Sequence, residues 1–159
     1  MKLNLTVNGR SKEVDAEPRR LLADVLRTEF GAYGVHIGCA QGACGCCTVS
    51  VDGESRLSCL TFAAQCDGAE IQTIEGLGDK TRAHYLQRAF MAEHALQCGF
   101  CTPGFIMALA PFVDKAGDPS DAEIRDAMSG NMCRCTGYQS IVAAVRLAIE
   151  LRDAERGAA

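Results

Sequence analysis

Residues 38–59 read GCAQGACGCCTVSVDGESRLSC and combine a glycine-rich loop with a short hairpin pattern. The loop and hairpin carry a set of four cysteines, namely Cys39, Cys44, Cys47 and Cys59. Glycine permits positive φ angles and close backbone approach, so the loop can wrap a bound group with its N–H donors pointing inward. Four thiolates can enclose one tetrahedral metal ion or the two irons of a [2Fe–2S] cluster. The stretch therefore predicts a metal centre beside a small sheet.

A second set of four cysteines lies in two short passages, QCGFC at 97–101 and CRC at 133–135. Its members are Cys98, Cys101, Cys133 and Cys135. Both passages lead into segments with helical patterns, and the free N–H groups and positive dipole end at a helix start favour an anion. We therefore predict a second metal centre at the junctions between helices.

The spacing of the first set favours iron over zinc. A C-x4-C-x2-C run followed by a later cysteine is the plant-type ferredoxin pattern. Zinc is the alternative, since many structural zinc sites have four cysteine ligands. A C-x-C pair and a glycine-rich loop fit poorly with zinc knuckles, however, so we predict two [2Fe–2S] clusters.

The segments around the first set predict a small ferredoxin-like (β-grasp) domain over residues 1–76, in an α+β fold. Apolar residues alternate at Leu3, Leu5 and Val7, and Asn8-Gly9 is a strong hairpin signal before a strand at 12–14. Further strands are predicted at 48–51, 55–57 and 70–74. Apolar residues recur at helical spacing between 20 and 29, which predicts one helix against this sheet.

Residues 77–159 predict a four-helix domain. Helical patterns cover 84–97, 103–115, 120–129 and 138–152. Ser120 and Glu123 form a capping box at the start of the third of these helices. We expect the joint between the domains at 75–80, two antiparallel helix pairs around the second set, and a frayed tail at 154–159.

Composition limits the class of protein. The 159 residues include ten cysteines and carry a net charge of −4, which argues against nucleic-acid binding. The start of the chain has no signal-peptide pattern and no long apolar run is present, so we expect a cytoplasmic protein whose cysteines bind metal. Each half would hold only about 80 residues, a size at which bound metal stabilises a marginal core.

The cysteine passages resemble those of the small iron–sulfur subunit of the molybdenum hydroxylases, the xanthine oxidase and carbon monoxide dehydrogenase family. The resemblance covers residues 2–150 and rests on the passages GCAQGACGCCTV, SCLTFA, ALQCGFCTPGFIMA and GNMCRCTGYQSIV. It implies a plant-ferredoxin-like domain followed by a four-helix domain, each with one [2Fe–2S] cluster.

The resemblance also implies partners and a direction for electrons. In the family a substrate such as an N-heterocycle, an aldehyde or carbon monoxide is oxidised at a molybdenum–pterin cofactor in a large subunit. Electrons then cross the two clusters to FAD in a medium subunit, within a dimer of heterotrimers. The second set would lie nearer molybdenum, with Gln97 and Cys135 against the pterin, and the first set nearer the flavin. This chain would perform no bond chemistry itself.

Two cysteines fall outside the sets. Cys46 stands where the family usually has alanine or serine, and it could compete with Cys47 for iron. Neighbouring side chains in an extended segment point apart, so a bystander thiol is favoured. Cys66 is predicted to be a spare thiol. The alternatives to an electron-transfer subunit are a free-standing two-cluster carrier and a zinc-stapled interaction module.

Overall fold

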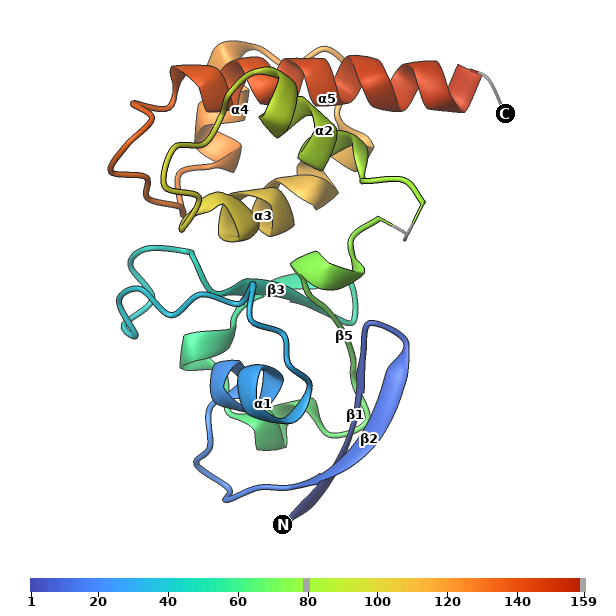
Figure 1. Ribbon diagram of the computed structural model, residues 1–159, viewed down its shortest axis with the longest axis vertical. Helices are drawn as coiled ribbons and strands as arrows, with labels where there is room; N and C mark the ends of the chain where they lie inside the picture. Colours follow the sequence, from blue (N-terminus) through green and yellow to red (C-terminus); the bar gives the residue numbers. More distant parts are fainter. Residues whose placement is uncertain (79–80, 158–159) are drawn as a thin grey trace.

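The first strand, β1 (Lys2–Val7), shows how the sequence builds the sheet. Leu3, Leu5 and Val7 are buried, and the residues between them face outward. In the computed structural model, which describes residues 1–78 and 81–157, this strand lies inside a five-stranded mixed sheet (Figure 1). The sheet order is β2-β1-β5-β3-β4, with β1 and β5 parallel and the other pairs antiparallel. The remaining strands are β2 (Arg10–Asp15), β3 (Thr48–Val51), β4 (Glu54–Leu57) and β5 (Glu70–Gln72).

Both hairpin turns have the backbone that their sequences predict. Asn8 and Gly9 have φ angles of 50° and 75°, and Asp52 and Gly53 have φ angles of 51° and 84°. Two successive positive φ angles define the type I′ turn, whose twist matches that of the flanking strands. The last strand is shorter than predicted, because residues Ile74–Gly76 form a 3-10 turn.

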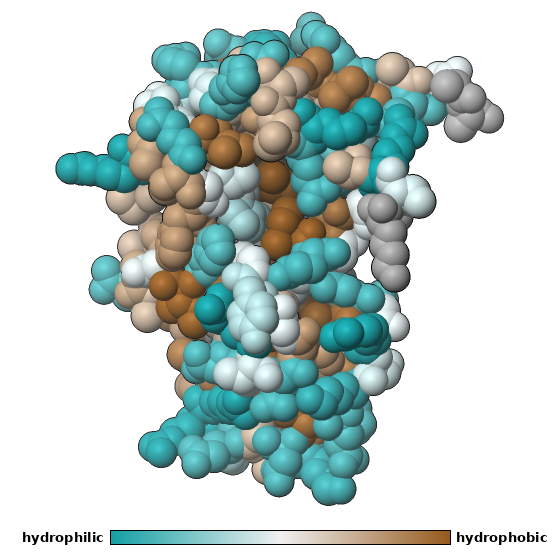
Figure 2. Space-filling model, viewed as in Figure 1, coloured by the Kyte–Doolittle hydropathy of each residue, from teal (hydrophilic) through white to brown (hydrophobic). Residues whose placement is uncertain are grey.

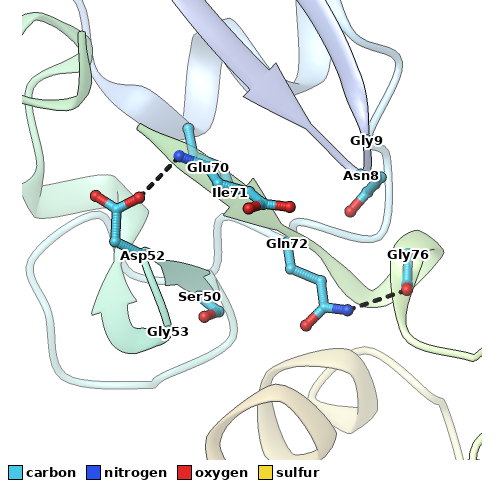
Figure 3. A pocket seen from close by; sticks show the side chains of 9 residues that line it. All are labelled: Asn8, Gly9, Ser50, Asp52, Gly53, Glu70, Ile71, Gln72 and Gly76. Atoms are coloured by element: carbon cyan, nitrogen blue, oxygen red, sulfur yellow. Dashed lines mark hydrogen bonds between the residues drawn. The ribbon is translucent and has the colours of Figure 1, made fainter. Parts of the chain in front are cut away.

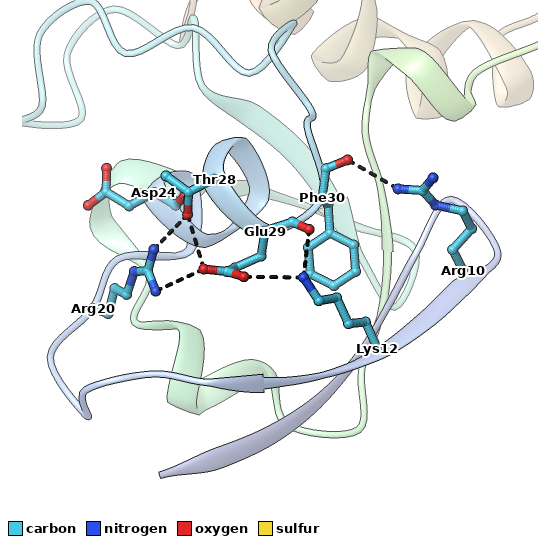
Figure 4. A network of polar contacts seen from close by, with 7 residues as sticks. All are labelled: Arg10, Lys12, Arg20, Asp24, Thr28, Glu29 and Phe30. Atoms are coloured by element: carbon cyan, nitrogen blue, oxygen red, sulfur yellow. Dashed lines mark hydrogen bonds and ion pairs between the residues drawn. The ribbon is translucent and has the colours of Figure 1, made fainter.

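One helix, α1 (Leu22–Glu29), packs its apolar face against the sheet. A polar network fixes its carboxyl end to β2 (Figure 4). Glu29 accepts from Lys12 and Arg20 at 3.2 and 3.3 Å, and Arg10 donates to the carbonyl of Phe30 at 3.1 Å. The hydrogen bond from Lys12 lowers the pKa of Glu29, so the carboxylate stays ionised.

Four helices follow within the described residues. They are α2 (Tyr85–Ala92), α3 (Thr102–Lys115), α4 (Asp121–Ala127) and α5 (Gln139–Gly157). The capping box predicted at Ser120 is present, since its hydroxyl accepts from the backbone N–H of Glu123 and the Glu123 carboxylate accepts from the backbone N–H of Ser120. The four helices stack on the sheet part along the long axis of the molecule (Figure 1).

Two helix boundaries differ from the prediction. α2 ends at Ala92, because His94 has a φ of 51° and the N–H of Ala95 turns back to the carbonyl of Phe90. Cys98 therefore lies in a loop and not at a helix end. α5 continues to Gly157 and includes most of the expected tail. Residues 158–159 of that tail, and 79–80 of the expected joint, lie outside the described residues.

The buried apolar residues form two separate clusters. One lies between the sheet and α1, and the other lies among α2 to α5. α5 packs against α2, α3 and α4, so it is the shared centre of the helical part and not one member of two separate pairs. On the face shown in Figure 2, apolar side chains gather at mid-height, between the two parts. None of the described helices is long and apolar enough to cross a membrane.

Arg152 on α5 is a buried charge that joins two helices. The residue is 4 % exposed, and its guanidinium donates to the carbonyls of Val113 and Ala116 at the end of α3. It also binds the carboxylate of Asp153. A positive charge at the carboxyl end of a helix satisfies carbonyls that lack a helical partner.

We expect Arg152→Met to lower the free energy of unfolding by about 2–3 kcal/mol, because it removes charged hydrogen bonds to buried carbonyls. Arg146→Ala on the same helix is the control, since its pair with Asp121 is exposed and is worth about 1 kcal/mol or less. Urea unfolding of the metal-loaded chain, followed by circular dichroism, compares the two. Equal losses for both variants would contradict the role given to Arg152.

Candidate metal centres

The first cysteine loop needs glycine at two of its turns. Gly42 and Gly45 have φ angles of 79° and 70°. A Cβ at Gly42 would lie 2.5 Å from the side chain of Leu60, and a Cβ at Gly45 would lie 2.4 Å from the amide nitrogen of Asn131. No larger residue fits either position without displacing its neighbour. The glycine-rich loop predicted over 31–47 is confirmed as a segment without strands or helices.

The first set of cysteines lies in two pairs. The side chains of Cys39 and Cys44 lie close to each other, and both residues are half-buried. The side chains of Cys47 and Cys59 also lie close to each other, and these residues are buried at 2 % and 3 % exposure. Cys59 is held there by its neighbour, because the hydroxyl of Ser58 donates to the Cys47 carbonyl at 2.7 Å.

The second set has the same arrangement. The sulfurs of Cys98 and Cys135 lie 3.6 Å apart and are exposed. Cys101 and Cys133 form the inner pair, with Cys101 at the N-cap of α3. Tyr138 accepts from the backbone N–H of Cys133 at 2.9 Å and fixes its position at the entrance to α5.

Pairs of sulfurs suit a [2Fe–2S] cluster better than a single ion. Each iron of such a cluster takes two of the four thiolates, whereas the four ligands of a zinc site converge on one point. All eight cysteines of the two sets lie within the described residues 1–78 and 81–157, and two sets of four thiols match the ligand number of two [2Fe–2S] clusters.

Hydrogen bonds prepare one thiol in each set to carry negative charge. The backbone N–H of Gln41 and that of Ala43 donate to the Cys39 sulfur at 3.5 and 3.3 Å, and they lower its pKa to about 6. Burial opposes ionisation of Cys133, but the hydroxyl and N–H of Thr136, at 3.2 and 3.4 Å, bring its pKa down to about 7. Donors that stabilise a thiolate also stabilise the sulfurs of an anionic cluster.

Burial holds the proton on other cysteines. It raises the pKa of Cys59 to about 11 and that of Cys101 to about 12. Since a metal takes the thiolate, binding at these positions must displace a proton.

The two remaining cysteines are buried thiols. Burial raises the pKa of Cys66, which lies in the core below the sheet. Burial likewise raises the pKa of Cys46 to about 12. The Cys46 sulfur donates to the carbonyl of Cys44 at 3.8 Å and is also close to the Cys44 thiol. A bystander role for both stays a prediction.

The fold brings two cysteines of the first set and all four of the second to one depression of about 800 Å³. Its walls include both half-buried cysteines of the first set, all four of the second, and Phe100 and Met132. Phe100, between two cysteines of the second set, is 45 % exposed and stacks on His36 with ring centres 4.7 Å apart. The His36 ring nitrogen Nδ1 hydrogen-bonds to the Phe100 carbonyl at 2.7 Å.

Gln97 lies at the exposed edge of the second set. Its side-chain amide donates to the carbonyl of Cys135 at 3.1 Å, and both residues are exposed. The two residues expected against a pterin are therefore neighbours.

Sequence reasoning missed the residues that join the two sets. Asn131 is buried and donates to the carbonyl of Gly45 at 3.0 Å, across 86 positions of sequence. Gly104 lies against the backbone of Cys46. The sequence offers two signals: a glycine within a predicted helix, Gly104, and an asparagine two positions before the predicted ligand Cys133. Neither signal reveals a contact with the first cysteine loop.

A separate depression of about 300 Å³ lies between the hairpin turns and β5 (Figure 3). Its polar groups bind one another: the Asp52 carboxylate accepts from the N–H of Glu70 at 2.9 Å, and Gln72 donates to the carbonyl of Gly76 at 3.1 Å. No cysteine lines this depression. Its hydrogen bonds hold the hairpin turns and the end of β5 in place.

Comparison with known proteins agrees with this geometry. A family of 2Fe-2S iron-sulfur cluster binding domains matches residues 5–71, and a family of [2Fe-2S] binding domains matches residues 73–146. The chain is 48 % identical to subunit beta of the 6-hydroxypseudooxynicotine dehydrogenase complex of Paenarthrobacter nicotinovorans, over 96 % of both chains. It is 45 % identical to the nicotinate dehydrogenase small FeS subunit of Eubacterium barkeri, over 93 % of this chain and 94 % of the other.

A solved structure has the same fold. A chain of quinoline 2-oxidoreductase from Pseudomonas putida 86 superposes with a TM-score of 0.91 at 44 % identity. The match covers 99 % of this chain and 97 % of that one.

The pairing predicts which cysteines can be replaced. We expect Cys59→Ala to reduce the iron content from about four to about two per chain, because one [2Fe–2S] site loses a ligand. Cys66→Ala is the matched control, since Cys66 is equally buried but belongs to neither set, and it should retain all the iron. Metal analysis and EPR of the reduced protein measure both variants. Full iron in Cys59→Ala would refute the assignment of this ligand.

Proposed function

Because the chain belongs to the family of small iron–sulfur subunits of the molybdenum hydroxylases, we propose that it relays electrons between two partner subunits. Electrons leave a molybdenum–pterin site in a large subunit, cross two [2Fe–2S] clusters in this chain, and reach FAD in a medium subunit. The observation that carries the proposal is that two cysteines of the first set and all four of the second line one depression, while Cys47 and Cys59 of the first set are buried.

Each set would hold one cluster. The first set would lie on the flavin side and the second on the molybdenum side, in a β-grasp domain over 1–76 and a four-helix domain over 77–159. When bound, the clusters accept and pass on one electron at a time. The ligands of the two clusters are Cys39, Cys44, Cys47, Cys59, Cys98, Cys101, Cys133 and Cys135.

The chain's own groups set the environment of these sites. Backbone N–H groups at Gln41 and Ala43, and both donors of Thr136, stabilise negative sulfur. Hydrogen bonds to sulfur and exclusion of solvent are the means by which a protein adjusts the potential of such a cluster. Cys47 and Cys59 are both buried, so water is excluded from their side of the first site.

Exposed apolar side chains favour a subunit over a free-standing carrier. Phe100 and Met132 border the second set at 45 % and 58 % exposure. Leu60 and Phe62, which follow Cys59, are 57 % and 44 % exposed. Large apolar side chains that stay exposed beside both cysteine sets are suited to contact with a partner protein. Both cysteine sets would thus face a partner.

We further propose an N-heterocycle as the substrate of the complex, since two of the similar proteins are named for nicotinate and quinoline. A dimer of heterotrimers in the cytoplasm is the proposed assembly. Substrate oxidation itself would occur in the large subunit.

One preparation tests the proposal. The complex purified through a tag on this chain should contain molybdenum, FAD, and about four irons and four sulfides per copy of the chain. Dithionite reduction should give two distinguishable EPR signals. Zinc without sulfide would refute electron transfer. Both clusters without a molybdenum subunit would favour the free-standing carrier.

The position of Gln97 gives a prediction for the complex. We expect Gln97→Ala to slow reduction of the clusters by substrate on the order of tenfold, which corresponds to the loss of one hydrogen bond of about 1.4 kcal/mol at the pterin contact. Gln41→Ala is the control, because its side chain is exposed beside the first set and its backbone donor is retained.

Stopped-flow absorbance after mixing with substrate measures this step, and iron content should be unchanged in both variants. An unchanged rate in Gln97→Ala would contradict the placement of Gln97 against the pterin.

A further inference from the structure

Two backbone segments that adjoin candidate ligands run against each other. One is 44–46, which begins with Cys44, and the other is 130–132, which leads into Cys133. The N–H of Met132 donates to the carbonyl of Cys44 at 3.0 Å. We call this contact, together with Gly104, the seam. It links the two cysteine sets through residues next to their ligands.

Asn131 adds a side-chain bond to the seam. Its amide nitrogen donates to the Gly45 carbonyl at 3.0 Å, and the residue is 7 % exposed. Its backbone N–H is bonded to the carbonyl of Met128 at 3.0 Å, at the end of α4. The side chain is therefore anchored to the helical part at its base and to the first cysteine loop at its tip.

The Gly45 carbonyl does not depend on Asn131 for a partner. It also accepts from the hydroxyl of Thr48 at 2.7 Å and from the Thr48 N–H at 3.2 Å. Those two donors lie within the sheet part, so they fix the loop locally. Among the described residues, the Asn131 side chain is the one hydrogen-bond donor from the helical part to this carbonyl. Its bond therefore positions the two parts, since the carbonyl already has two other donors.

The backbones of the two parts are in close contact at the seam. A Cβ at Gly104, in the first turn of α3, would lie 2.4 Å from the Gly45 oxygen and 2.7 Å from the Cys46 Cα. A Cβ at Gly45 would lie 2.4 Å from the Asn131 amide nitrogen and 2.6 Å from the Gly130 oxygen. Backbone meets backbone on both sides, so the contact fixes a distance that flexible side chains could not.

We propose that Asn131 is a positioning residue that sets the separation of the two iron–sulfur sites, with Gly104 as the surface against which the first loop rests. The inference rests on the proposed function, because it requires a cluster in each set. Electron transfer between centres depends steeply on their separation, and a fixed seam keeps that separation constant in every molecule.

The magnetic coupling between two reduced clusters measures their separation directly, since dipolar splitting falls with the cube of the distance. We would record EPR spectra of the whole complex after dithionite reduction, for the unchanged protein, Asn131→Ala and Gly104→Ala. Asn131→Ala only removes atoms and leaves the Gly45 carbonyl with two donors, so folding should survive it.

We expect both variants to keep the iron content and the g-values of the two signals, and to show a smaller and less uniform splitting. Asn8→Ala is the matched control. It removes two side-chain hydrogen bonds to Thr73, at 2.8 and 2.9 Å, from a buried edge away from the seam. It should lower stability but leave the splitting unchanged.

An unchanged splitting in both iron-loaded variants would overturn the inference. Loss of iron from one set in both variants would overturn the inference as well. Asn131 and Gly104 would then be needed to form one cluster site, and they would not set the distance between two sites. If the unchanged protein lacks two signals, the proposed function itself fails, and the two failures are thereby distinguished.

Discussion

The close grouping of sulfur atoms is the constraint on which the rest of this structure depends. Thiolates in contact repel each other, and burial raises the pKa of Cys59 and Cys101 to about 11 and 12. Burial therefore keeps the proton on Cys59 and Cys101 until a metal displaces it. The loops compensate at other cysteines with N–H and hydroxyl donors to sulfur. A glycine-rich loop and two helix junctions are the means by which a small chain gathers eight such groups.

Local chemistry made much of this fold predictable. The two I′ turns, the strand at 2–7, the Ser120 capping box and the glycine loop each depend on residues within a few positions of one another. Both cysteine sets could be recognised for the same reason, since their spacing within each passage is short.

Long-range contacts decided what could not be predicted. The residues after Ala92 favour a helix, yet the chain turns there, because Cys98 has to reach Cys135 across the helical part. Phe100 has an apolar side chain but lies beside His36 from the other part of the molecule. The seam is the hardest contact to predict, because the partner of Asn131 is the backbone carbonyl of Gly45. Every residue has such a carbonyl, so the sequence does not indicate which one is bound.

The unequal exposure of the cysteine pairs has a consequence for biogenesis. Cys47 and Cys59 are sealed within the protein, whereas Cys98 and Cys135 are open to solvent. An assembly factor could reach Cys98 and Cys135 in the folded chain, but Cys47 and Cys59 only before the chain has finished folding. If partner subunits cover Cys98 and Cys135, the two clusters must be inserted at different stages. The first is inserted as its domain folds, and the second before the complex assembles.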